Sequence, residues 1–189
     1  MIIKSAVILI EIIISYLLQT TVFSGLRLAD VVPDIFMILI ASLAYMCGKK
    51  TGAVTGFLCG LLLDLTFGNL VGIYALIYTV LGYSCGFANV VYDPEDYTLP
   101  SFLIGGSEFL YNIFYFIFFY VLMGKINIGY FSVRFLFPRV IYTVMVSIVL
   151  YRLLNFNFKL FDSMDRKKRL KNEGVIEFKN FDFIGRRSL

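Results

Sequence analysis

Four glycines and one aspartate recur at intervals of four residues within one apolar stretch of the chain: Gly52, Gly56, Gly60, Asp64 and Gly68. Residues four apart lie on one face of an α-helix, where small side chains let a second helix backbone approach closely, as in helix association within lipid. An ionisable group at membrane depth normally faces a bundle interior or a cavity and marks function. Asp64 is therefore either a functional group or part of a simple helix contact.

The composition indicates that this helix lies in a membrane. The chain has 189 residues, 59% of them hydrophobic, and a mean hydropathy of +0.83, whereas soluble domains average roughly 45–50% apolar residues. Because one crossing takes about 17–25 residues, the length allows five or six spans and a tail, with no room for a second folded domain. We therefore predict an all-α integral membrane protein.

Six apolar segments are candidate transmembrane helices, with approximate ranges 5–23, 33–48, 51–67, 70–91, 99–123 and 133–154. Pro33 and Asp34 open the second, because proline suits the first helical turn and a carboxylate complements the positive helix end. The second and third helices are short for a bilayer and are expected to form a helical hairpin partly buried within the bundle. The chain thus divides into a six-helix transmembrane domain, 1–154, and a basic tail, 155–189.

Lysine and arginine placement orients the predicted bundle. With six spans and the amino terminus inside, the inner side holds Lys4, Lys49, Lys50 and the whole tail, as the positive-inside rule requires. Both termini are therefore predicted to be cytoplasmic. The largely basic run 166–171 follows either from that rule or from contact with anionic headgroups of the lipid bilayer. Binding of nucleic acid is not indicated.

Polar side chains form stripes inside two of the predicted spans. Glu11, Ser15 and Gln19 repeat at four-residue spacing in the first span, and Glu108 and Asn112 repeat it in the fifth. Each stripe shares one helix face and should turn toward other helices.

Arg139, which follows Pro138 in the last span, is the natural partner for one of the acids. Glu11, Asp64 and Glu108 are all candidates, and the sequence does not decide among them. Pairing reduces the burial cost of both charges, whether the pair serves to fix helix register or to carry out a function.

The fourth span carries a second seam of small residues, in which steps of three and four residues alternate. Such a seam suits close helix packing, and its members are Gly72, Ala75, Thr79, Gly82 and Gly86. We predict that one of the two glycine faces packs internally while another small-residue or aromatic face receives a partner's helix.

Enzyme chemistry is not indicated. The chain has no histidine, which removes imidazole as a general base and as a metal ligand. We find no phosphate-binding loop, no nucleophile elbow and no second deep aspartate to face Asp64. We therefore expect no catalytic activity, no cofactor and no metal.

The stretch from about Leu17 to Val90 resembles the bacterial rod shape-determining protein family MreD. In that family a Pro-Asp opening precedes a short helix, and a glycine-spaced helix ends in a Gly-Leu-Leu-Leu-Asp-Leu-like stretch followed by further glycines. The matching positions are Pro33, Asp34, Gly52, Gly56, Gly60, Asp64, Gly68 and Gly72. Beyond Val91 the resemblance rests on hydropathy, and the long basic tail departs from it.

The resemblance implies a non-catalytic scaffold of the cell-elongation machinery, in the bacterial cytoplasmic membrane. It implies binding to the single-span protein MreC, within an assembly that includes MreB, RodA and a penicillin-binding transpeptidase, and support of rod shape and lateral peptidoglycan synthesis. The functional core would be Asp64 with its glycine ladder, and Pro33 and Asp34 would shape the outer entrance to the second helix.

Two other interpretations remain open at this point. Proteins of this family also resemble the compact six-helix substrate-binding components of energy-coupling-factor vitamin transporters, in size and in small-residue helices. A transporter needs an outward pocket with a few convergent polar groups, which Glu11, Gln19, Glu108 and Asn112 could supply. The third interpretation is a structural bundle with a different partner.

Overall fold

The computed structural model describes residues 2–22, 25, 31–67, 72–93, 96–121, 129 and 132–158. Within them 92% of residues are helical, in six helices, which confirms the all-α class. The helices are α1 (Ile2–Leu17, continued to Val22 by a π-helical turn), α3 (Ile35–Cys47), α4 (Lys49–Phe67), α5 (Ile73–Cys85, continued to Val91 as a 3-10 helix), α6 (Thr98–Tyr115, continued to Val121) and a last helix, Ser132–Phe158.

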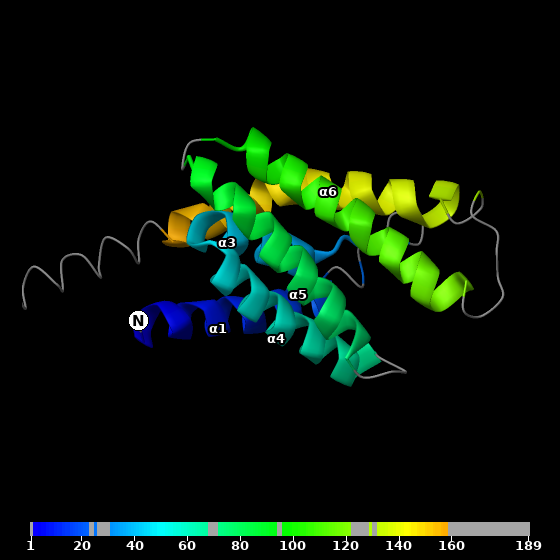
Figure 1. The fold of residues 1–189 in the computed structure, drawn as a ribbon, viewed down its shortest axis with the longest axis horizontal. Coiled ribbons are helices and arrows are strands. Elements are labelled where there is room, and N and C mark those ends of the chain that lie inside the picture. Colours follow the sequence, from blue (N-terminus) through cyan, green and yellow to red (C-terminus); the bar gives the residue numbers. More distant parts are fainter. Residues whose placement is uncertain are drawn as a thin grey trace, which may run out of the picture.

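Helix α3 forms the centre of the bundle. Its thirteen residues are apolar apart from Ser42, and every one from Ile35 to Met46 is buried. It contacts α1, α4, α5 and α6, and in Figure 1 α1 and α6 lie on opposite sides of it. At about 1.5 Å per residue it reaches only about 20 Å, less than a 30 Å hydrocarbon layer. Its shortness is accommodated because other helices surround it.

Three helices are long and apolar enough to cross a membrane: Ile73–Val91, Thr98–Phe118 and Ser132–Phe158. The apolar parts of the first two helices, Ala6–Val22 and Ile35–Cys47, are shorter. Three of the six predicted spans therefore have the length and the composition needed to cross, and the crossing itself stays a prediction for all six. Burial within the bundle was expected of the second and third helices. The expected burial was partial, and it holds for both helices, since α3 is buried and α4 buries Thr55 and Cys59 while it exposes Phe57 and Leu65.

Helices α4 and α5 pack with their backbones in direct contact, along the glycine ladder. A Cβ added to Gly52 would lie 2.4 Å from the carbonyl oxygen of Gly82. One added to Gly56 would lie 2.2 Å from the carbonyl oxygen of Tyr78, and one added to Gly60 would lie 2.4 Å from Cα of Ala75. The close contact predicted at these three glycines is confirmed, and its partner is the small-residue seam of α5 in the same chain.

Two further glycines, Gly68 of the ladder and Gly72 beyond it, were assigned to the same packing surface. Gly68 lies outside the described residues. Gly72 has φ +107° and would meet nothing within 4 Å of an added Cβ. It occupies the left-handed turn that precedes α5, a conformation that glycine adopts without steric cost. Its assignment to the packing face is corrected: Gly72 makes the turn, because α5 begins at Ile73.

The boundary between bundle and tail also differs from the prediction. The last helix continues to Phe158, because Asn155 is buried and Phe158 packs against a cluster around Tyr45 and Tyr151. Residues 155–158 therefore belong to the bundle. The basic run 166–171 and the rest of the predicted tail lie outside the described residues.

Candidate functional site

Asp34 caps the amino end of α3 and connects it to the last helix. Its Oδ1 accepts a hydrogen bond of 2.9 Å from the backbone N–H of Met37, the usual geometry of an N-cap aspartate. Its own backbone N–H donates to Oγ1 of Thr143 at 3.1 Å. The helix begins at Ile35, so Pro33 precedes the cap and does not occupy the first turn as predicted. The cause is that the Asp34 side chain supplies the capping oxygen.

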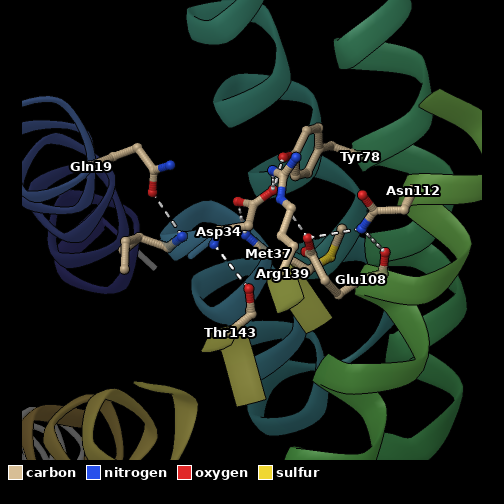
Figure 2. A network of polar contacts seen from close by, with 9 residues as sticks. Gln19, Asp34, Met37, Tyr78, Glu108, Asn112, Arg139 and Thr143 are labelled. Atoms are coloured by element: carbon tan, nitrogen blue, oxygen red, sulfur yellow. Dashed lines mark hydrogen bonds and ion pairs between the residues drawn. The ribbon is translucent and has the colours of Figure 1, made fainter. Parts of the chain in front are cut away.

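Arg139 joins two acids from different helices, as Figure 2 shows. Its Nη2 atom lies 3.1 Å from Oδ2 of Asp34, and its Nε atom lies 2.8 Å from Oε1 of Glu108. The guanidinium therefore lies between the start of α3 and the middle of α6. Of the three acids considered as partners from the sequence, only Glu108 pairs with it among the described residues.

Two neutral side chains, Tyr78 and Asn112, complete this arrangement. We call the whole set the Arg139 cluster: Asp34, Tyr78, Glu108, Asn112 and Arg139. The Tyr78 hydroxyl donates to Oδ2 of Asp34. The Asn112 amide donates to Oε1 of Glu108 at 3.1 Å and to the Glu108 carbonyl oxygen at 2.7 Å. The cluster thus links α3, α5, α6 and the last helix.

The charges of the cluster are almost completely removed from solvent. The side chains of Asp34 and Glu108 are 2% and 0% exposed, and that of Arg139 is 23% exposed. Desolvating such groups is expensive and is repaid only when charges and hydrogen bonds are matched. Two carboxylates share one guanidinium here, and Oε2 of Glu108 has no hydrogen-bond partner within the described part of the chain. Removing Arg139 would therefore leave both acids uncompensated.

A cavity of about 390 Å³ opens beside the cluster. Arg139 forms part of its wall and stacks over Tyr111, with its Cζ atom 5.0 Å from the ring centroid, within cation–π range. The wall is mostly aromatic and polar, and its side chains come from α1, α4, α5, α6, the last helix and the segment that precedes α3: Gln19, Thr20, Val32, Asp34, Leu63, Tyr74, Tyr78, Tyr111, Tyr115 and Arg139.

The chemistry of this cavity is that of hydrogen bonding and stacking. Asp34 and Arg139 form an ion pair with one another. The chain has no histidine. Within the described residues, no group of three or more His, Cys, Asp or Glu side chains could hold a metal ion. These residues tie helices together and present tyrosines to the cavity.

Asp64 has a structural contact of its own. It is 1% exposed, and its carboxylate accepts the backbone N–H groups of Tyr74 at 3.1 Å and Ala75 at 2.9 Å. These N–H groups open α5, where the preceding Gly72 has no side chain with which to cap them. A carboxylate on the neighbouring helix satisfies them and complements the positive helix end. Shielding of Asp64 by protein is confirmed.

The polar stripe of α1 is divided between two places. Gln19 accepts the backbone N–H of Ile35 through Oε1 at 2.8 Å, so it reaches the start of α3 beside the Arg139 cluster. Glu11 and Ser15 are buried at a separate crevice. Glu11 therefore belongs to neither the Arg139 cluster nor its cavity.

Sequence reasoning assigned Asp34 to helix initiation and missed its ion pair with Arg139. It also missed Tyr78 and Thr143. A signal was present, because Asp34 begins one predicted span and Arg139 follows a proline near the start of another. In the predicted topology both starts lie on the same side of the bundle, which would have made Asp34 a fourth candidate.

Comparison with known proteins gives one match. The family model described as rod shape-determining protein MreD matches residues 1–161 of the chain. No curated protein and no solved structure matches. The resemblance of the fold to energy-coupling-factor components therefore stays a prediction, and the comparisons offer no support for the vitamin-transporter interpretation.

Proposed function

The chain belongs to the MreD family of rod shape-determining proteins, and on this premise we propose that it is a non-catalytic membrane scaffold of the cell-elongation machinery. It binds the single-span protein MreC, within an assembly containing MreB, RodA and a penicillin-binding transpeptidase. Through that assembly it supports rod shape and lateral peptidoglycan synthesis. The observation that carries the proposal is the family match over residues 1–161.

The proposed topology is a six-span protein of the cytoplasmic membrane with both termini in the cytoplasm. Its support is the positive-inside distribution of lysine and arginine. In this orientation the starts of α3, α5 and the last helix face outward, together with the Arg139 cluster and its cavity. Asp34 and Pro33 then lie at the outer entrance to α3.

Two internal contacts support a role as a scaffold. The α4–α5 glycine contact and the Arg139 cluster bind α3, α4, α5, α6 and the last helix into one body. A scaffold needs such a body, because a partner helix can dock only on a surface that keeps its shape. The glycines of α4 face α5, so the proposed partner helix docks on another face of the bundle.

Depletion and co-purification test the proposal together. We expect cells depleted of this protein to become round and a tagged wild-type copy to restore rods and to co-purify MreC in mild detergent. A matched pair tests the scaffold: Gly56→Leu, which places a side chain against α5, should fail to restore rods, whereas Gly106→Leu, in open space, should restore them. Rod shape that persists on depletion, with no MreC recovered by the wild type, would contradict the proposal.

A further inference from the structure

A second crevice lies between α1, α3 and the last helix. Its volume is about 140 Å³, and apart from a few polar groups it is lined by aliphatic side chains. Ile14 and Leu153 belong to its lining and are 50% and 55% exposed, so they form its rim. Both lie in apolar helices. The crevice therefore opens sideways toward the membrane, away from the cavity at the Arg139 cluster.

Glu11 places a carboxyl group in the wall of this crevice. The residue is 7% exposed, and its Oε2 atom is buried with no hydrogen-bond partner within the described residues. Ser15 lies one helical turn further along the same wall. A buried acceptor that lacks a donor is unfavourable, and the surrounding hydrocarbon cannot supply a donor as water would. The bundle by itself thus leaves this acid incompletely paired.

The size and the lining of the crevice restrict what can occupy it. A lipid chain could cover Ile14 and Leu153 but brings no donor for Glu11. A volume of about 140 Å³ admits the end of one side chain and excludes a whole helix. A helix lying across the rim, with one polar side chain directed inward, satisfies both the apolar rim and the carboxyl group.

We propose that this crevice is the docking site of a partner's membrane-spanning helix, which inserts one hydrogen-bond-donating side chain toward Glu11. This inference rests on the proposed function, in which the partner is a single-span protein. It adds the face of the bundle that receives the partner and the chemistry that selects it. Intramembrane polar side chains commonly join helices in this way.

Two neighbouring residues of α1 provide a matched test. Ile14→Trp fills the rim, whereas Ile13→Trp adds the same bulk at a position that is 57% exposed and does not line the crevice. We expect Ile14→Trp to lower the partner recovered with the full chain roughly tenfold, which corresponds to about 1.4 kcal/mol. Ile13→Trp should retain wild-type recovery. Equal recovery with the two variants would overturn the inference while leaving the proposed function intact.

Substitution of Glu11 tests the chemistry. Glu11→Leu should abolish recovery of the partner without lowering the thermal stability of the isolated protein, because it removes a buried acceptor that the bundle leaves unpaired. Wild-type recovery with Glu11→Leu would overturn the inference.

Cross-linking identifies the occupant directly. A photoreactive residue at Leu153 in native membranes should form an adduct with the single-span partner, and one at Ile13 should not. Adducts only with lipid or with a second copy of this chain would overturn the inference. If the wild type recovers no partner at all, the proposed function fails first and this inference fails with it.

Discussion

The α4–α5 contact and the Arg139 cluster hold the same bundle together by opposite means. In the first, glycines remove side chains so that two backbones touch. In the second, charged and polar side chains reach across the spaces between four helices. The glycine contact depends on close fit, so an added side-chain atom should disrupt it. The Arg139 cluster depends on the pairing of opposite charges, so it should accept substitutions that remove the acids and the arginine together.

Tyr78 belongs to both regions and shows how they are coupled. Its carbonyl oxygen lies where a side chain on Gly56 would be, and its hydroxyl donates to Asp34. A shift of α5 away from α4 would therefore also displace a donor of the Arg139 cluster. The glycine contact therefore fixes the position of α5, and with it the position of the Tyr78 hydroxyl in the Arg139 cluster.

The strongest test of the difference is a substitution in the glycine contact. Gly56→Leu should prevent α4 and α5 from packing, because the added Cβ would lie 2.2 Å from a backbone oxygen that cannot move aside. The loss should exceed both the roughly 1–3 kcal/mol typical of overpacking and the roughly 3–5 kcal/mol of a broken buried ion pair, because two backbones must separate. Thermal unfolding measures it, followed through exposure of the buried Cys59 and Cys85 thiols in a Cys47→Ser background. Gly106→Leu is the control, and an equal melting temperature for both variants would contradict the shape argument.

Removal of the shared cation should have the next largest effect. Arg139→Leu leaves Asp34 and Glu108 without their common partner, and breaking a buried pair in this way costs about 3–5 kcal/mol. Unlike the glycine contact, the cluster should be repairable: adding Asp34→Asn and Glu108→Gln to Arg139→Leu should restore part of the lost stability in the same unfolding assay. A triple variant less stable than the single variant would show that the charges do not act as a balanced set.

The hydroxyl of Tyr78 tests the link between the two regions. Tyr78→Phe leaves the backbone contact with Gly56 and removes one donor to Asp34, so we expect a loss of about 1.5–3 kcal/mol, the range for hydrogen bonds to charged groups. Tyr83→Phe, at a residue 47% exposed, is the matched control and should be neutral. The same loss in both variants would remove Tyr78 from the cluster.

The cap of α5 should have the smallest effect of the four. Asp64→Ala removes both acceptor oxygens from the N–H groups of Tyr74 and Ala75, and loss of a cap typically costs about 0.5–2 kcal/mol. Asp64→Asn keeps one acceptor and should lose less, which denaturation of the two variants in parallel would show. Greater loss with Asn than with Ala would mean that the contact is not a cap.

Local features of this chain were readable from its sequence to different extents. Gly52, Gly56 and Gly60 were predicted to make a close contact because spacing along one helix defines a face without knowledge of the rest of the fold. The same argument misplaced Gly72, since spacing alone does not show where one helix ends and the next begins. The partner of Arg139 was harder, because the ion pair with Asp34 joins residues 105 positions apart.

By itself the sequence determined the all-α membrane class, the approximate helices and the glycine face of α4, because hydropathy and helical period act within one segment. Only the tertiary structure decided that α5 covers that face, that α3 lies at the centre, that Asp64 caps α5, and that Asp34 and Glu108 share Arg139. These contacts join helices whose relative rotation and depth are set by the packing of the whole bundle, which no single segment encodes.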